Sequence, residues 1–202
     1  MSLSGISRVV GIPMFPLPDF HLFPGALVPL HIFEPRYRQM ISDLLDTAGR
    51  LVMGSIRAQD APTVYGPSVF TIGGLGEIVS HRRLDDGRYL IWLLGLERVR
   101  LKEIESDRLY RRVDATVLRD EEGDAERNAE LEPKLRAAIE KRMLPGIELT
   151  GSLGAGLLAD ILYQHLPLTA AQKEWALAQR NVTRRAGAAL AWLDGLADEA
   201  EA

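Results

Sequence analysis

The proline-rich segment from residue 13 to residue 45 constrains the fold more than any other part of the chain. It reads PMFPLPDFHLFPGALVPLHIFEPRYRQMISDLL, and its prolines and Gly25 cut the apolar sequence into short pieces. The piece from Leu27 to Phe33 has the length and the boundaries of a buried strand. The residues that follow repeat at spacings of three and four, which predicts a helix with one apolar face. That face comprises Phe33, Tyr37, Met40, Ile41, Leu44 and Leu45.

Local signals place the ends of this helix. Pro35 suits the first turn, where its missing N–H costs no hydrogen bond, and acidic Glu34 suits the positive end of the helix dipole. Gly49 lies just beyond the expected end. We therefore expect a helix over residues 33–45.

Further strands are predicted up to residue 118. A short apolar run covers Leu51–Ile56, and the segments 69–83 and 87–94 flank Asp85-Asp86-Gly87, an Asp-Gly signal for a tight hairpin turn. The Gly73-Gly74 pair predicts a bulge or sharp bend in the first strand of that hairpin. Alternation of apolar and polar residues predicts two more half-buried strands, at 98–102 and 113–118.

The composition changes near residue 120, which predicts two lobes. Residues 1–119 form the β-rich lobe, and residues 120–202 form a helical bundle that we expect to pack on it. We interpret residues 120–130 as a charged connector and 151–156 as a loop. Helices are predicted at 132–144, at 157–165 and in two segments after Thr169, which is a candidate N-cap. Their boundary signals are Pro133, Pro145-Gly146, Pro167 and Gln172.

The overall composition is that of a globular protein in a reducing compartment. The chain has 202 residues, of which 47% are hydrophobic and 26% charged, and it contains no cysteine. No stretch approaches the roughly 20 apolar residues of a membrane span, and no signal peptide is recognisable. A net charge of -4 makes nucleic acid an unfavoured partner. We expect a cytoplasmic protein without membrane contact.

Motifs for catalysis or cofactor binding are missing from the sequence. The chain has no Gly-Lys step for a phosphate loop, and GGLGEI lacks the third glycine of a dinucleotide motif. His21 and His31 stand ten residues apart without metal-ligand spacing, and no serine lies in a nucleophile elbow. We therefore predict no catalytic residue, no metal and no cofactor.

Three segments together resemble the amino-terminal, substrate-recognition domain of Lon proteases. They are FPLPDFHLFPGALVPLHIFEPRYRQMI, IGGLGEIVSHRRLDDGRYLIWLLGLERVRL and LLADILYQHLPLTAAQKEWALAQRNVTRRAGAALAWL, within residues 12–194. The string FEPRYR, from Phe33 to Arg38, is found especially in stand-alone members of that family. The resemblance implies an α+β fold, with a PUA-like twisted β-barrel of about six strands, one packed helix and a small C-terminal helical bundle.

The resemblance also implies a function. It points to a non-catalytic module that recognises exposed or unfolded polypeptide segments or a protein partner. The sequence ends before the ATPase and serine–lysine domains of a full Lon protease could begin, so we expect no proteolysis by this chain. The apolar connections around residues 22–30 could line a groove. The candidate partner-binding residues are Leu22, Phe23, Pro24, Leu27, His31, Glu34, Arg36 and Tyr37.

Other interpretations stay open for the same residues. The prolines and aromatic residues are also typical of barrel packing and turns, and Glu34 with Arg36 of a solvated helix start. RNA binding is an alternative, with Arg108–Arg112 as a basic strip around a stacking Tyr110, although a charged strand edge explains the strip as well. A small-molecule receptor or an enzyme could use a cleft between the lobes, with His21, His31, Glu34 or Arg36 as polar groups.

Overall fold

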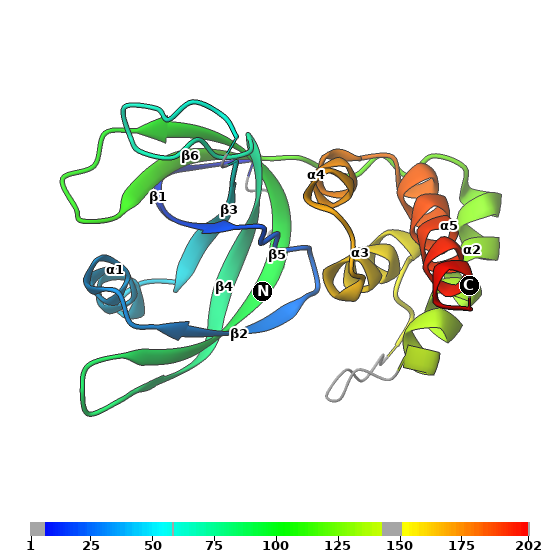
Figure 1. Ribbon diagram of the computed structural model, residues 1–202, viewed down its shortest axis with the longest axis horizontal. Coiled ribbons are helices and arrows are strands. Elements are labelled where there is room, and N and C mark those ends of the chain that lie inside the picture. The colour runs from blue at the N-terminus through cyan, green and yellow to red at the C-terminus, as the bar shows by residue number, and fades with distance from the viewer. Residues whose placement is uncertain (1–6, 58, 143–150, 202) are drawn as a thin grey trace. The chain divides into compact units, whose positions relative to one another are not determined.

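The computed structural model describes residues 7–57, 59–142 and 151–201 (Figure 1). The chain divides into two compact units, Met1–Leu118 and Arg119–Ala202. The first unit holds the strands and the second unit holds helices alone, in the part of the chain that is described. The expected packing of the bundle on the barrel stays a prediction.

The strands of the first unit form one mixed sheet that nearly closes into a ring (Figure 1). Within the described residues the order is β2-β5-β4-β3-β1-β6, and an additional pairing joins β5 to β6. This arrangement, with one packed helix and helices after it, confirms the predicted fold class. The strands are β1 (Arg8–Pro18), β2 (Leu27–Ile32), β3 (Arg50–Ile56), β4 (Ile72–Arg83), β5 (Tyr89–Ile104) and β6 (Arg111–Val117).

The hairpin between β4 and β5 forms where the Asp-Gly signal predicts it. Gly87 adopts a φ of 79°, which a residue with a side chain rarely tolerates. The predicted bulge at Gly73-Gly74 is wrong, because the register shifts lie after Leu75 and after Ile78. The two strands expected at 87–94 and 98–102 are a single strand, β5, which pairs along one edge first with β2 and then with β6.

β1 is a strand that the sequence did not reveal. Its prolines suggested turns, yet Pro13 lies opposite Arg112 of β6 and Pro16 lies opposite Gly54 of β3. β1 pairs with β6 through its first half and with β3 through its second half. β6 in turn pairs with both β1 and β5, so the interpretation of residues 108–112 as a strand edge is wrong.

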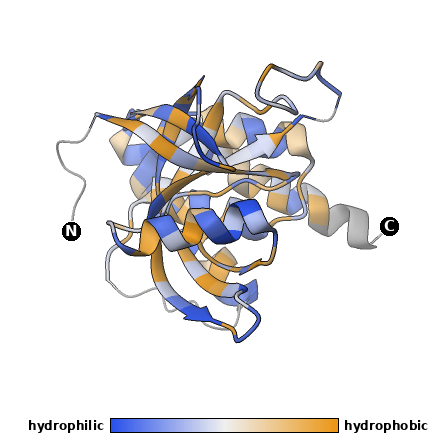
Figure 2. Cartoon of the chain, turned by 90° about the vertical axis from the view of Figure 1, so that its left-hand side faces the viewer, coloured by the Kyte–Doolittle hydropathy of each residue, from blue (hydrophilic) through white to orange (hydrophobic). Residues whose placement is uncertain are grey.

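Helix α1 (Pro35–Leu45) packs its apolar side against the barrel core. Tyr37, Met40, Ile41 and Leu44 are buried there, and the outward side of the helix is mostly hydrophilic (Figure 2). Phe33 does not belong to this face, because it precedes the helix and keeps 61% of its surface exposed. Pro35 occupies the start of the helix as expected.

The second unit contains the helices α2 (Ala125–Arg142), α3 (Ala155–His165), α4 (Ala170–Ala178) and α5 (Val182–Glu201). α2 begins seven residues earlier than expected, so most of the supposed connector is helical and Pro133 lies inside the helix. The cause is Asp124, whose Oδ1 accepts the Arg127 N–H at 3.0 Å and caps the helix. Met143 and Pro145-Gly146 lie outside the described residues. The capping box of Thr169 and Gln172 forms as predicted.

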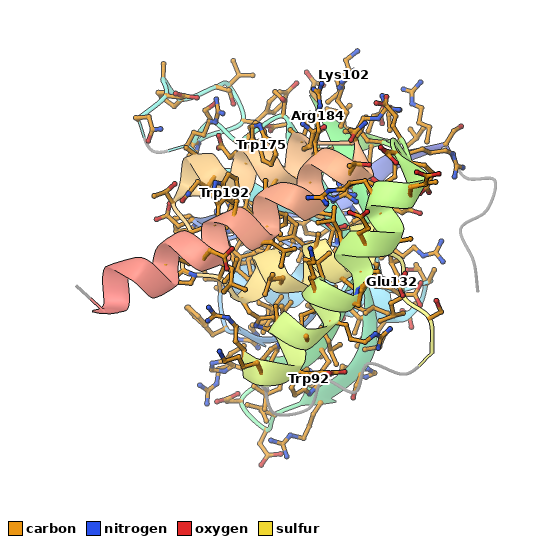
Figure 3. The ribbon with its side chains drawn as sticks, turned by 90° about the vertical axis from the view of Figure 1, so that its right-hand side faces the viewer. Trp92, Lys102, Glu132, Trp175, Arg184 and Trp192 are labelled. Atoms are coloured by element: carbon orange, nitrogen blue, oxygen red, sulfur yellow. The ribbon has the colours of Figure 1, made fainter. Side chains whose placement is uncertain are left out.

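A buried ion pair links α5 to α3, and a second ion pair links α5 to Asp120. Arg185 of α5 has a fully buried side chain and lies 2.6 Å from Asp120 and 3.0 Å from Asp160 of α3. The Tyr163 hydroxyl donates to the Arg185 carbonyl at 2.7 Å. Burial raises the pKa of Tyr163, so this hydroxyl keeps its proton. Trp175 and Trp192 lie side by side nearby, with ring centroids 5.3 Å apart (Figure 3).

Among the described residues, no helix combines the length and apolar character needed to cross a bilayer.

Candidate functional site

The outer side of β2 exposes apolar residues. Along this strand buried and exposed side chains alternate: Val28 and Ile32 are buried, whereas Leu27, Pro29 and His31 are exposed. Leu27 keeps 46% of its surface exposed. Phe33 continues the alternation beyond the strand, with its ring centroid 5.8 Å from that of His31. A row of exposed and mostly apolar side chains therefore runs from residue 27 to residue 33.

The neighbouring strand β5 extends this row sideways. Leu94, Trp92 and Leu90 of β5 lie directly opposite Leu27, Pro29 and His31. Directly opposite residues of an antiparallel pair have Cβ atoms about 5 Å apart, so their side chains are neighbours on one side of the sheet. Trp92, labelled in Figure 3, keeps 45% of its surface exposed. We call this surface the β2–β5 face; it comprises Leu27, Pro29, His31, Phe33, Leu90, Trp92 and Leu94.

β2 also carries unpaired backbone groups along one edge. Among the described strands it pairs with β5 alone. The Gly95 N–H donates to the Ala26 carbonyl at 2.8 Å, and antiparallel pairing alternates from there. The backbone groups of Leu27, Pro29 and His31 therefore point away from β5. Pro29 has no N–H, and an edge strand is the place where proline is tolerated in a sheet.

Several sequence-predicted contact residues lie inside the barrel instead. Leu22 and Phe23 have fully buried side chains. Their segment crosses so close to the sheet that a Cβ at Gly74 would stand 2.2 Å from the Leu22 carbonyl oxygen. His21 is buried as well, with 3% exposed, and Pro24 is half-buried. Leu22 and Phe23 pack the core, and so they are not accessible to a partner.

The start of α1 holds the other predicted group. Arg36 Nη2 lies 2.8 Å from Glu34 Oε2, so the two residues form a partly exposed ion pair. The Arg36 guanidinium also lies 4.5 Å from the centre of the Tyr37 ring. Tyr37 itself is 3% exposed, and burial raises the pKa of its hydroxyl. Glu34 and Arg36 are thus solvent-accessible but tied to each other, and Tyr37 is a core residue.

Two residues of the predicted set, Leu27 and His31, lie on the same exposed side of β2. Trp92, at the centre of the face, was missed because the sequence around it, LIWLL, is apolar throughout. Such a run shows no alternation that would separate an outward residue from an inward one. His21 is buried while His31 is exposed, so these two histidines do not share a surface.

The basic strip around Tyr110 does not present a stacking ring. Tyr110 is 6% exposed, and its hydroxyl donates to Asp43 at 2.9 Å. Arg111 pairs with Glu103, and Arg112 donates to the Gly11 carbonyl at 2.8 Å. These partners occupy the tyrosine and both arginines in contacts within the barrel. Elsewhere in the described residues, no group of three histidine or acidic side chains is arranged to hold a metal ion.

Solved structures with the same fold define the fold class of this chain. The N-terminal domain of Lon protease from the Mycobacterium avium complex is similar, with a TM-score of 0.64 and 20% identity over 90% of this chain and 97% of that one. The Lon N-terminal domain protein of Xanthomonas campestris gives a TM-score of 0.63 and 24% identity over 93% of this chain and 99% of that one. Both likenesses establish a Lon N-terminal-domain fold.

The chain belongs to the family of substrate-binding domains of the ATP-dependent protease La (LON), whose model matches residues 11–195. Lon protease 2 of Sorangium cellulosum is 30% identical over 152 residues, which are 72% of this chain and 16% of that protein. Lon protease of Escherichia coli K12 is 25% identical over 193 residues, which are 89% of this chain and 24% of that protein. The chain thus spans a quarter or less of these proteases.

Proposed function

We propose that this chain is a non-catalytic module that binds extended, apolar segments of polypeptide on the β2–β5 face. The observation that carries the proposal is the exposure of Trp92 and Leu27 on neighbouring, paired strands. Clustered large apolar side chains at a surface favour contact with another protein. A tryptophan supplies a large contact area for little loss of conformational freedom.

The backbone groups at the outer edge of β2 favour a partner in an extended conformation. A bound segment adds its backbone hydrogen bonds to the groups of Leu27 and His31 that point away from β5, while alternate side chains meet the apolar face. Pro29 interrupts this ladder because it offers no N–H. The interruption limits backbone pairing and leaves side-chain contact with Trp92 as the larger part of the interaction.

Family membership supports the same ligand class. The matched family is described as a substrate-binding domain, and the similar chains named above belong to Lon proteases. We infer from this a polypeptide ligand rather than RNA, because Tyr110 is buried and the strip's Arg111 and Arg112 are engaged within the barrel. The family match also favours binding without catalysis by this chain.

A comparison of folded and unfolded ligands tests the proposal. A carboxymethylated, permanently unfolded protein is titrated against the chain, with the same protein in its folded form as reference. We expect saturable binding of the unfolded form alone. Trp92→Ser should weaken this binding at least tenfold, whereas Val64→Ser, which removes an apolar side chain 93% exposed outside the face, should not. Equal binding of both ligand forms, or equal loss in both variants, contradicts the proposal.

A further inference from the structure

The charges that border the β2–β5 face are unevenly distributed. On β4, Arg82 lies directly opposite Leu90, and on the other side of Leu90 lies His31 of β2. One row across the sheet therefore reads His31, Leu90, Arg82. Arg82 is exposed, and within the described residues it has no ion-pair partner. An unpaired guanidinium thus stands at one end of an apolar surface.

Three carboxylates that border this face are already bound to arginines. Glu77, opposite Leu94, lies 2.9 Å from Arg50. Glu34, next to Phe33, lies 2.8 Å from Arg36. At the hairpin, Asp86 lies 2.6 Å from Arg88. Each of these acids is neutralised by its own partner, so none of the three forms an ion pair with Arg82.

We propose that the β2–β5 face selects extended segments in which an acidic residue follows the apolar ones and places its carboxylate at Arg82. This inference rests on the proposed function and names the substrate class of that site. Successive residues on one side of a strand are about 7 Å apart. Arg82 lies on β4, two strands from β2, so a carboxylate two positions from the side chain that contacts Trp92 meets it when the long Arg82 side chain extends across Leu90.

Charge at this position acts on selectivity more than on total affinity. An exposed ion pair contributes up to about 1 kcal/mol, which corresponds to about a two- to fivefold change in affinity. Salt weakens such a pair, since the Debye length falls to about 3 Å at 1 M. The apolar contacts with Trp92 and Leu27 do not depend on salt in this way, so the two contributions are separable.

Three labelled peptides test this selectivity by fluorescence anisotropy. They share an extended apolar core of alternating leucine, tyrosine and valine, followed by two aspartates, two asparagines or two lysines. We expect the aspartate peptide to bind two- to fivefold more tightly than the asparagine peptide in 50 mM salt, and the lysine peptide to bind most weakly. In 1 M salt the three affinities should converge.

The variant Arg82→Gln should abolish this preference, so that the aspartate and asparagine peptides bind it equally. Arg100→Gln is the matched control, because Arg100 is exposed on β5 but lies eight residues from Trp92, about 25 Å along the strand. It should keep the preference. Equal binding of all three peptides to the unmodified protein overturns the charge selectivity alone. If none of the three peptides binds, the proposed function is overturned.

Discussion

Gly95 of β5 lies so close to Phe23 that a Cβ at position 95 would stand 2.0 Å from the Phe23 carbonyl oxygen. The contact is a crossing of two backbones: the Gly25 N–H donates to the Gly95 carbonyl at 2.9 Å, and the Gly95 N–H donates to the Ala26 carbonyl at 2.8 Å. This crossing buries Leu22 and Phe23 and brings the chain into β2. The β2–β5 face thus depends on a glycine in the partner strand.

Gly95→Ala should destabilise the barrel. The added methyl group meets the Phe23 carbonyl oxygen, which is held by the Ala26 N–H at 3.2 Å, so overpacking should cost about 1–3 kcal/mol or more. The urea midpoint, followed by circular dichroism, measures the loss. Gly187→Ala places the same methyl group in α5 where nothing lies within 4 Å, and it should leave the midpoint unchanged or raise it. Equal midpoints for the two variants would rule out the crossing as a packing constraint.

Arg185→Met should destabilise the helical unit strongly. The arginine is fully buried between Asp120 and Asp160, and its removal leaves the Asp160 side chain, 2% exposed, without its cation. Loss of one partner from a buried ion pair costs about 3–5 kcal/mol. Arg184→Met, at the exposed neighbouring position labelled in Figure 3, should change the stability by less than about 0.5 kcal/mol. Urea unfolding of both variants measures the loss of unfolding free energy. Similar losses in Arg185→Met and Arg184→Met would refute a structural role for the two ion pairs of Arg185.

Asp114→Asn should weaken the barrel in a pH-dependent way. Arg8 Nη2 donates to Asp114 at 2.6 Å and the Gly11 N–H donates at 3.0 Å, and these bonds lower the pKa of the Asp114 carboxyl. A lowered folded-state pKa means that the carboxylate stabilises the fold above the unfolded pKa of about 3.9. That contribution is lost as the pH falls through the folded pKa.

The urea midpoints of the unmodified protein and Asp114→Asn should therefore differ at pH 7 and converge as the pH falls below about 4. Asp107→Asn is a control, because its carboxylate is 77% exposed and lies 3.7 Å from Arg108. A difference between Asp114→Asn and the unmodified protein that persists unchanged to low pH would contradict the assignment.

Local sequence signals predicted three local features correctly. The Asp-Gly turn, the Thr169 capping box and Pro35 at the start of α1 each depend on residues within a few positions of one another. β1 was not predictable in this way, because its prolines mark turns in most contexts. They are tolerated here since the strand changes partners from β6 to β3 partway along its length.

The candidate site was only partly predictable, for a different reason. The burial of Leu22 and Phe23 depends on Gly74 and Gly95, which lie about 50 and 70 positions away in the sequence. Trp92 sits within a run of apolar residues whose inward and outward members become distinct only when β2 and β4 pair with β5. Leu27 and His31 belong to a short segment that was predicted as a buried strand; the strand forms, but one of its sides is exposed. Their role in binding stays a prediction.

Trp92 provides the most direct test of the central claim, that polypeptide binds on the β2–β5 face. The chain has three tryptophans. In the double variant Trp175→Phe, Trp192→Phe, Trp92 therefore reports alone. The aspartate peptide is made with phenylalanine in place of tyrosine and titrated while tryptophan emission and anisotropy are recorded together. We predict a saturable shift of the Trp92 emission to shorter wavelength that follows the anisotropy curve. Binding seen by anisotropy with the Trp92 emission unchanged would place the ligand elsewhere and contradict the claim.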